Sequence, residues 1–364
     1  MNVVFAGGGT GGHLYPGLAI ARAMVRLDPS VRPFFIGAER GIERTVLPDS
    51  GFPFALLPLH PLYRRQPWNN GKTIIGVLAG WGRLGAMMRE LSPAVVVGTG
   101  GYASGLTMAW AIAHGVPTVQ QVADAIPGMT ARIFSRWARA LYLGFGEAER
   151  RLPRRAATEV VIIGNPVDPP PNPGISQAAA RALFHMPENG VNRVVLVFGG
   201  SQGARAINDS VRDWVASGLP AGLHLIWATG PAGYDDYKQW AGTTVVVRPY
   251  LSPISDAYAA CDLAVTRAGA MTCAELTAWG RPAILVPLPT AAADHQTGNA
   301  RAIAAAGAGV LLPQLELTGG RLAGEIVSLL GDGQRLDSMA ERSREIGRPH
   351  AAEVIARHIL ATFK

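Results

Sequence analysis

The sequence contains few of the residues that mark several common classes of protein. It has only two cysteines, Cys261 and Cys273, with no Cys-x-x-Cys pair and no histidine pair at helical spacing. This pattern argues against a disulfide framework and against a structural zinc site. Charged residues make up 16% of the chain and hydrophobic residues 48%, a composition that predicts a packed globular protein and excludes a disordered one.

Signals for export or for crossing a membrane are also lacking. Residues 1–6 run into a strand-like segment without a basic region, so no signal peptide is predicted and we expect a cytoplasmic chain. The longest apolar stretch, residues 73–88, contains Arg83 and is too short to span a bilayer. It can lie on a membrane surface, although its four glycines argue against a stable isolated helix, and it can equally be half-buried in a domain.

Positive charge is concentrated in one half of the chain. Residues 1–166 hold 17 Arg and Lys against 9 Asp and Glu, a net charge of +8, whereas residues 167–364 hold 16 against 17. Such an uneven field suits an anionic partner, namely a phospholipid surface, a polyphosphate or nucleic acid. Arginine supplies 30 of the 33 basic residues, so an arginine-rich solubilising surface explains the excess equally well.

Short apolar runs alternate with helical stretches through both halves of the chain, which predicts an α/β fold with parallel sheets. Residues 165–174 contain five prolines and form a predicted linker between a domain of residues 1–164 and a domain of residues 175–350. A helix over 351–363 is expected to pack back on the first domain. The expected strands cover 3–6, 34–36, 95–97, 118–120, 160–163, 194–198, 223–228, 244–248, 263–266 and 283–286. The expected helices cover 14–27, 106–114, 130–139, 204–215, 271–279 and 299–306.

Three glycine-rich loops, residues 7–13, 98–105 and 199–204, each follow a predicted strand. Glycine lets the backbone approach an anion closely, and the N-terminus of the next helix supplies N–H donors. In parallel sheets such loops meet at the carboxyl edge. Two such loops lie in the first domain and one in the second. Together they supply more phosphate-binding backbone than a single nicotinamide cofactor requires, so we expect two phosphorylated ligands.

Other nucleotide sites are disfavoured by the residues around these loops. No Gly-Lys-Ser/Thr follows any of the three loops, which argues against a P-loop NTPase, and no well-placed acidic residue ends the second strand, although Glu39 is nearby. No Asp-x-Asp is present to bridge a metal to a nucleotide sugar. The charge of a diphosphate must therefore be met by helix dipoles and backbone N–H groups.

The segments 266–276 and 287–300 carry side chains suited to a nucleotide sugar. A turn of small residues opens a helix that can hold a diphosphate, and the Glu275 carboxylate in that helix can accept both hydroxyls of a ribose. His295 and Gln296 begin another helix and can bond sugar hydroxyls. Each of these residues also has an interpretation without a ligand. Glu275 can be a solvated residue on a helix surface, and His295 and Gln296 can be polar residues that cap the start of a helix.

These segments resemble the MurG family when they are taken together with three further motifs. The motifs are Gly-Gly-Thr-Gly-Gly-His-Leu-Tyr-Pro-Gly at 8–17, Gly-Asn-Pro-Val at 164–167 and Gly-Gly-Ser-Gln-Gly-Ala at 199–204. The resemblance covers nearly the whole chain. It implies a GT-B fold, in which two Rossmann-like domains face a central cleft, and no metal or other cofactor. It further implies inverting transfer of N-acetylglucosamine from UDP-GlcNAc to the C4 hydroxyl of MurNAc in lipid I, which gives lipid II in peptidoglycan synthesis.

The resemblance also implies roles for individual residues. His13 matches a histidine near the reacting hydroxyl, and Asp124 is a rival general base. The donor residues so implied are Ser201, Gln202, Gly203, Leu251, Ala270, Met271, Thr272, Glu275, His295, Gln296 and Asn165. The acceptor-pyrophosphate residues are Gly8, Gly9, Thr10, Gly11, Gly12, Thr99, Gly100, Gly101 and Tyr102. The membrane contacts are Arg64, Arg65, Lys72, Ile75, Trp81 and Arg83, which would place the protein peripherally on the cytoplasmic face of an anionic membrane, with no nucleic acid partner.

One segment and two single positions depart from the family pattern. Residues 121–124 read Gln-Val-Ala-Asp where the family usually has His-Glu-Gln-Asn, Asp168 replaces an arginine, and Ala293 replaces a residue that is often acidic. Three alternative functions therefore stay open. They are a related GT-B transferase with a different sugar or lipid acceptor, a UDP-sugar 2-epimerase, and a non-catalytic UDP-sugar-binding protein.

Overall fold

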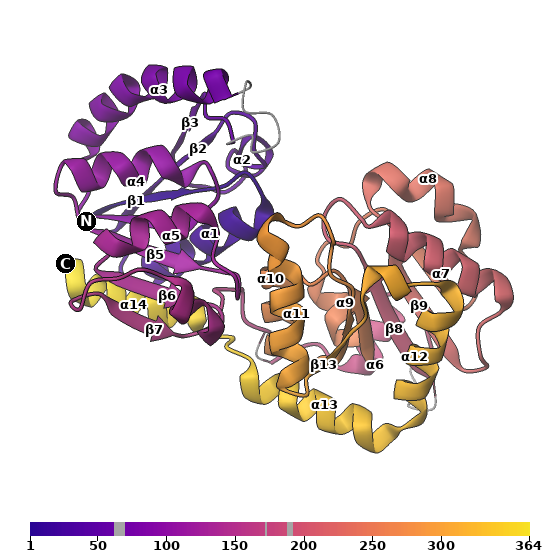
Figure 1. The fold of residues 1–364 in the computed structure, drawn as a ribbon. Coiled ribbons are helices and arrows are strands. Elements are labelled where there is room, and N and C mark those ends of the chain that lie inside the picture. The colour runs from indigo at the N-terminus through magenta and orange to yellow at the C-terminus, as the bar shows by residue number, and fades with distance from the viewer. Residues whose placement is uncertain (62–69, 172, 188–191) are drawn as a thin grey trace. The chain divides into compact units, whose positions relative to one another are not determined.

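The computed structural model describes residues 1–61, 70–171, 173–187 and 192–364. The chain forms two compact units (Figure 1). Unit 1 contains Met1–Asp168 together with His350–Lys364, and unit 2 contains Pro169–Pro349. Each unit has its own parallel sheet covered by helices, so each is described separately.

Unit 1 is built on a seven-stranded parallel sheet with the order β3-β2-β1-β4-β5-β6-β7. Its strands are β1 (Asn2–Gly7), β2 (Arg32–Ala38), β3 (Phe54–Leu57), β4 (Val95–Gly100), β5 (Thr118–Val122), β6 (Ala140–Leu143) and β7 (Glu159–Ile162). Its helices are α1 (Gly11–Leu27), α2 (Glu43–Val46), α3 (Asn70–Leu91), α4 (Ser104–Ala113), α5 (Met129–Phe134) and α14 (Ala351–Phe363).

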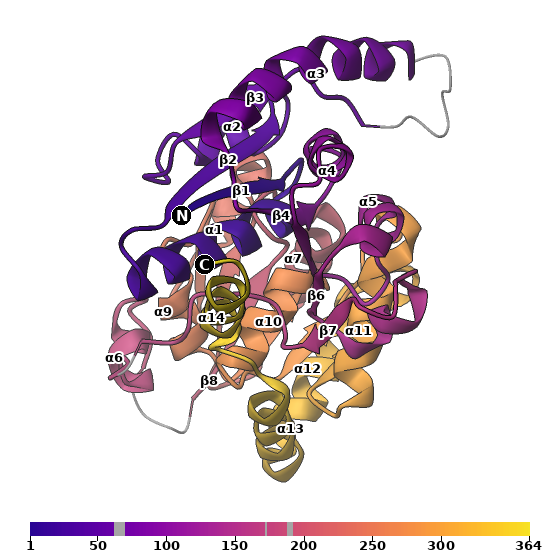
Figure 2. The same cartoon turned by 90° about the vertical axis from the view of Figure 1, so that its left-hand side faces the viewer.

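The sheet of unit 1 is buried on both faces, which explains why its central strands are continuous apolar runs. In β1, Val3 and Phe5 point into a cluster formed with α1 and α14. Val4 and Ala6 point the opposite way, into a cluster formed with α3 and α4. Figure 2 shows these two helix pairs on opposite sides of the sheet.

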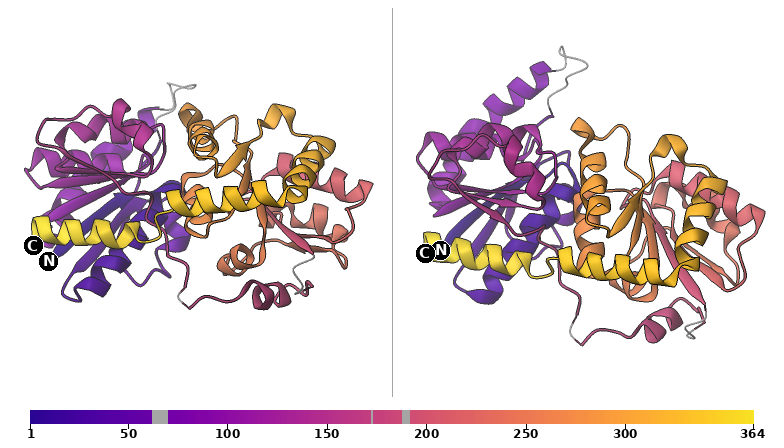
Figure 3. Two further views of the ribbon diagram at one scale, coloured as in Figure 1. Left: turned by 90° about the horizontal axis from the view of Figure 1, so that it is seen from below. Right: turned by 60° about the horizontal axis from the view of Figure 1, so that its bottom comes forward.

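The helix predicted over 351–363 is present as α14 and belongs to unit 1. It lies along α1, and Ile355 and Ile359 share a buried cluster with residues of that helix. His358 contacts the Tyr142 hydroxyl through Nδ1 at 2.7 Å and Glu159 through Nε2 at 3.1 Å. The two ends of the chain consequently lie close together (Figure 3).

Unit 2 has a six-stranded parallel sheet with the order β10-β9-β8-β11-β12-β13. Its strands are β8 (Arg193–Phe198), β9 (Leu223–Ala228), β10 (Val245–Arg248), β11 (Leu263–Thr266), β12 (Ala283–Leu285) and β13 (Gly309–Leu311). Its helices are α6 (Gln177–Ala182), α7 (Arg205–Ser217), α8 (Tyr234–Tyr237), α9 (Ser255–Ala260), α10 (Ala270–Ala278), α11 (His295–Ala305), α12 (Gly319–Gly331) and α13 (Gly333–Ile346). One core cluster of this unit packs α7 and α12 against β8 and β9.

All the strands predicted from apolar runs are present, and one helical prediction needs correction. The helix expected over 130–139 ends at Phe134 and continues as a 3-10 turn over Ser135–Trp137, because Ala138 is extended and leads into β6. Residues 73–88 form part of α3, which is 22 residues long, and Leu84 and Met88 are buried in the core of unit 1, in agreement with the half-buried alternative. A Cβ on Gly76 would lie 2.2 Å from the Pro58 carbonyl oxygen, so that glycine permits close packing. Tertiary contact here overrides helix propensity.

Candidate functional site

The two glycine-rich loops of unit 1 meet at the carboxyl edge of its sheet, after the adjacent strands β1 and β4. The Gly8 N–H donates to the Gly100 carbonyl oxygen at 3.3 Å. Gly101 has a φ of +74°, and a Cβ there would lie 2.0 Å from the Gly8 carbonyl oxygen. Only glycine fits this position, because the positive φ and the close approach both exclude a side chain.

His13 is held at the junction of these loops. The Thr99 hydroxyl donates to the His13 carbonyl oxygen at 2.6 Å, and Nδ1 lies 3.0 Å from the Thr10 hydroxyl oxygen. The ring packs over Gly100, where a Cβ would lie 2.6 Å from His13 Cδ2. In the tautomer whose Nδ1–H donates to Thr10, Nε2 carries the lone pair and can accept a proton.

The helices that follow the two loops direct their N-termini to the same edge. Neither α1, which begins at Gly11 and Gly12, nor α4 has an acidic residue in its first turn. The partial positive charge of each helix end is therefore not offset there by the helix's own side chains. The Tyr102 ring closes on the first loop, since a Cβ on Gly9 would lie 2.7 Å from Tyr102 Cε1. This part of unit 1 is built to receive an anion.

Glu43 is a site residue that the sequence did not indicate. Its side chain is fully buried, with Oε2 accepting from the Gly9 N–H at 2.9 Å and Oε1 accepting from the Ala38 N–H at 3.0 Å. A Cβ on Gly37 or Gly41 would come within 2.7 or 1.8 Å of this side chain. The carboxylate thus ties the first glycine loop to the end of β2. In the sequence, only the glycines near Glu43 could have indicated that its side chain is enclosed. Glu39, the acidic residue considered at the end of this strand, is exposed.

Asp124 lies two residues beyond β5, the strand next to β4, and is partly buried. A buried amide pair holds the chain beside it. Gln121 Nε2 donates to Asn165 Oδ1 at 2.8 Å, and Asn165 Nδ2 donates to the Ala123 carbonyl oxygen at 2.9 Å. The resemblance assigned Asn165 to the donor, whereas these contacts place its amide inside unit 1. Asp168 makes an exposed ion pair with Arg22 at 3.5 Å.

In unit 2, the third glycine loop lines a cavity of about 560 Å³. The structure brings together there five of the residues expected to bind the donor, which are Ser201, Gln202, Gly203, Thr272 and Gln296. Gly203 has a φ of +76°, and a Cβ on it would lie 2.1 Å from the Thr229 carbonyl oxygen. Helix α10 begins at Ala270 and Met271 beside this cavity, without an acidic residue in its first turn. The cavity is therefore suited to a diphosphate.

Arg267 also lines this cavity, and no motif in the sequence pointed to it. Its guanidinium donates to the Val286 and Pro287 carbonyl oxygens at 3.1 and 3.2 Å, and to Gln314 Oε1 at 2.7 Å. Burial lowers the pKa of Arg267. The three acceptors fix a positive charge in the cavity wall. In the described parts of the chain, no three His, Cys, Asp or Glu side chains gather as metal ligands.

Apart from Asn165, the other donor candidates also lie in unit 2. In α10, Glu275 Oε2 accepts a hydrogen bond from the Tyr258 hydroxyl at 2.7 Å. Burial and the nearby carboxylate raise the pKa of Tyr258 well above its usual value, so the phenol remains a donor. Gln296 Oε1 accepts from the Leu288 N–H at 2.9 Å, beside His295 at the start of α11. Leu251 is buried after β10.

The predicted membrane contacts are only partly described. Arg64 and Arg65 lie outside the described residues, and Lys72 and Ile75 are part of α3. Trp81 and Arg83 are exposed on the same helix, with Trp81 37% accessible and its ring centroid 6.4 Å from that of His114. Among the described residues, no helix combines the length and apolar character needed to cross a membrane.

Comparisons with known proteins agree with this architecture. Residues 3–143 match the glycosyltransferase family 28 N-terminal domain, and residues 194–355 match the glycosyltransferase family 28 C-terminal domain. The chain is 40% identical, over 100% of both chains, to the UDP-N-acetylglucosamine–N-acetylmuramyl-(pentapeptide) pyrophosphoryl-undecaprenol N-acetylglucosamine transferase of Moorella thermoacetica.

Solved structures give the same result for the fold. Acinetobacter baumannii MurG superimposes with a TM-score of 0.75 at 25% identity, over 99% of each chain. A putative UDP-N-acetylglucosamine 2-epimerase from Listeria monocytogenes has a TM-score of 0.67 at 16% identity, over 100% of this chain and 96% of its own. The second likeness concerns the fold alone. The predicted fold class, two Rossmann-like domains of GT-B type, is confirmed.

Proposed function

Since the chain belongs to the family of UDP-N-acetylglucosamine–N-acetylmuramyl-(pentapeptide) pyrophosphoryl-undecaprenol N-acetylglucosamine transferases, we propose that it converts lipid I to lipid II. It transfers N-acetylglucosamine from UDP to the C4 hydroxyl of the muramyl group. One observation carries the proposal: each unit has its own anion-binding edge, one for each diphosphate-bearing substrate. In unit 1 it is the paired loops around His13, and in unit 2 it is the cavity beside Ser201.

The donor diphosphate lies against the Ser201–Gly203 loop, with the N-terminus of α10 and the Arg267 guanidinium supplying positive charge. These groups stabilise the charge that develops on UDP as the bond to the sugar breaks. The Glu275 carboxylate, oriented by Tyr258, accepts hydrogen bonds from the ribose hydroxyls. His295 and Gln296 contact the sugar.

The acceptor diphosphate lies on the two loops of unit 1, at the N-termini of α1 and α4. The C4 oxygen attacks the anomeric carbon, the bond from that carbon to the UDP oxygen breaks, and its electron pair leaves with UDP. The configuration inverts because displacement is direct. His13 Nε2 accepts the proton of the hydroxyl, with Asp124, in the loop after β5, as the rival base.

The test is transfer of radiolabelled N-acetylglucosamine from UDP to a lipid I analogue. Transfer with inversion at the anomeric carbon supports the proposal. Tight binding of UDP-GlcNAc without transfer would redirect the search to another acceptor or to a non-catalytic role. Loss of UDP-GlcNAc without any acceptor would instead indicate an epimerase.

Glu275→Gln should raise the KM for UDP-GlcNAc about 10- to 100-fold, because hydrogen bonds to a charged group contribute about 1.5–3 kcal/mol. The KM for the acceptor should stay unchanged, since Glu275 lies in unit 2. Steady-state kinetics with each substrate varied in turn measures both. The matched control is Glu325→Gln on α12, whose carboxylate pairs with Arg321 on the surface. An equal rise for both variants would contradict the ribose assignment.

We also infer that α3 lies against the cytoplasmic face of an anionic membrane. Its exposed Trp81 and Arg83 supply an aromatic and a basic contact on one helix. The double variant Trp81→Ala, Arg83→Gln should bind vesicles of phosphatidylglycerol several-fold more weakly in a sedimentation assay. Arg89→Gln, on the last turn of α3, provides the charge control. Unchanged binding by the double variant would rule out this surface.

A further inference from the structure

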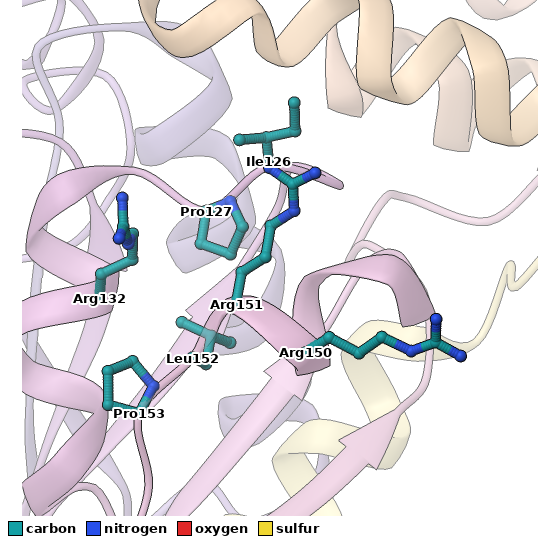
Figure 4. Close-up of a pocket in the computed structure, with 7 residues that line it drawn as sticks. All are labelled: Ile126, Pro127, Arg132, Arg150, Arg151, Leu152 and Pro153. Carbon is teal, nitrogen blue, oxygen red and sulfur yellow. The ribbon is translucent and has the colours of Figure 1, made fainter.

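A second concave site lies at the carboxyl edge of unit 1, and the mechanism above does not use it. It is a cavity of about 460 Å³ whose lining comes from the loop after β5, from α5 and from the turn after β6. The lining residues, shown in Figure 4, are Ile126, Pro127, Arg132, Arg150, Arg151, Leu152 and Pro153. We call it the arginine pocket. Ile126 follows Asp124 by two positions, so the pocket adjoins the candidate catalytic loop.

The charge of this pocket is positive and uncompensated. Residues 126–155 contain seven arginines and two glutamates, a net charge of +5, which is most of the excess of the first half of the chain. Nearby Arg154 pairs with Glu149 at 2.8 Å. Within the described residues, Arg132, Arg150 and Arg151 have no such carboxylate partner. Three like charges around one cavity repel each other, and a bound anion removes that repulsion.

The side chains divide into a polar and an apolar part. Figure 4 shows Arg151 extending toward Ile126 and Arg132 on the other side of Pro127, while Arg150 points away from both. Arg132 and Arg151 therefore flank the cavity, and Arg150 adds charge at its margin. Ile126, Pro127, Leu152 and Pro153 supply apolar surface. Guanidinium groups beside apolar surface suit a carboxylate or phosphate carried on a hydrocarbon chain.

The order of the strands relates this pocket to the acceptor. Along the carboxyl edge, the loops after β1 and β4 come first, then the Asp124 loop after β5, then the turn after β6. A muramyl group carries its peptide on the C3 oxygen, next to the C4 hydroxyl that reacts. When the diphosphate occupies the first two loops and C4 faces the base, the peptide leaves the sugar one carbon away. The next feature along the edge is the arginine pocket.

We propose that the arginine pocket binds a carboxylate of the acceptor's pentapeptide. A peptide joined through its amino end keeps a free C-terminal carboxylate, and its side chains supply the apolar contacts. Arg132 and Arg151 pair with the carboxylate in the pocket, and Arg150 adds to the positive electrostatic potential there. This assignment rests on the proposed function, because it takes lipid I as the acceptor. It makes the pocket a determinant of acceptor specificity rather than a part of the reacting centre.

The test compares three lipid I analogues: one with a free peptide carboxylate, one with a C-terminal carboxamide and one without a peptide. For the carboxylate analogue, the double variant Arg132→Gln, Arg151→Gln should raise the KM roughly five- to tenfold with kcat unchanged. For the analogue without a peptide, the KM should stay the same. The KM for UDP-GlcNAc should also be unchanged, and unchanged kinetics with the analogue without a peptide shows that unit 1 is folded.

The matched control is Arg136→Gln, Arg139→Gln, which removes the same charge from a cavity at the opposite, amino edge of the same sheet. If this control raises the KM for the carboxylate analogue equally, the effect comes from the overall positive charge of unit 1 and not from the pocket, and the proposal is overturned. An equal rise for the analogue without a peptide would instead assign the pocket to the diphosphate. Weaker binding of the pocket variant to phosphatidylglycerol vesicles, with kinetics on all three analogues unchanged, would assign it to a lipid surface. Failure of the unaltered protein to use any analogue would overturn the proposed function, and this assignment with it.

Discussion

His13→Gln should lower kcat about 10²- to 10⁴-fold, the range expected for loss of a general base. The KM for UDP-GlcNAc should change little, because His13 lies in unit 1 and the cavity proposed for the donor is lined by residues of unit 2. The imidazole is oriented for this role by the Thr10 hydroxyl at 3.0 Å and by packing over Gly100. Steady-state kinetics across a pH series is the measurement.

The pH series also separates the two candidate bases. If His13 accepts the proton, the rate of the unaltered enzyme falls on the acid side as the imidazole is protonated, and His13→Gln removes that limb. Thr10→Val should lower kcat about tenfold through the lost orientation of the ring, whereas Thr10→Ser retains it. Asp124→Asn is the competing variant. A collapse of kcat in Asp124→Asn, with His13→Gln nearly active, would transfer the role of base to Asp124.

Glu43→Ala should destabilise unit 1 by about 3 kcal/mol or more. The variant leaves the N–H groups of Gly9 and Ala38 without the carboxylate that accepts from both, and hydrogen bonds to charged groups contribute about 1.5–3 kcal/mol each. Amide hydrogen exchange at Gly9 and Ala38 measures the effect locally, which is useful because a chain of two units need not unfold in one step. Exchange at both amides should accelerate by about two orders of magnitude.

The same variant should weaken the acceptor site more than the donor site. The Gly9 loop is part of the proposed anion-binding edge of unit 1. The KM for the acceptor should therefore rise, while the KM for UDP-GlcNAc stays unchanged. Glu39→Gln is the matched control, because Glu39 is exposed and lies four residues before Glu43. Unaltered exchange at Gly9 in Glu43→Ala would show that the loop does not depend on the carboxylate.

The fold could be predicted because its signals are local. An apolar run such as Val194–Phe198 followed by Gly199 and Gly200 indicates a buried strand and a tight turn without reference to any other segment. Short strands such as β13 (Gly309–Leu311) were not predicted, since three residues carry too little pattern. The packing of helix α3 could not be predicted, because the role of Gly76 depends on Pro58, which lies 18 residues earlier in the chain and contacts it only in the folded unit.

The site residues divide in a similar way. The glycine loops, Glu275 and Gln296 stand out by residue type and position after strands. Glu43, Asn165 and Arg267 act through partners 34, 42 and 47 residues away, at Gly9, Ala123 and Gln314, and no spacing in the sequence announces such pairs. For Asn165, a motif indicated that the residue matters, and the fold showed that its amide faces the interior of unit 1.

The division of the chain has a consequence for biosynthesis. Unit 2 is inserted into unit 1, because residues 169–349 separate the sheet of unit 1 from α14. On the ribosome, the first 168 residues emerge long before Ile355 and Ile359, which cover the buried side of α1. Unit 1 therefore waits for the end of translation to complete its core, whereas unit 2 has all its residues earlier. A nascent chain arrested after residue 349 would expose the apolar face of α1 to chaperones and proteases.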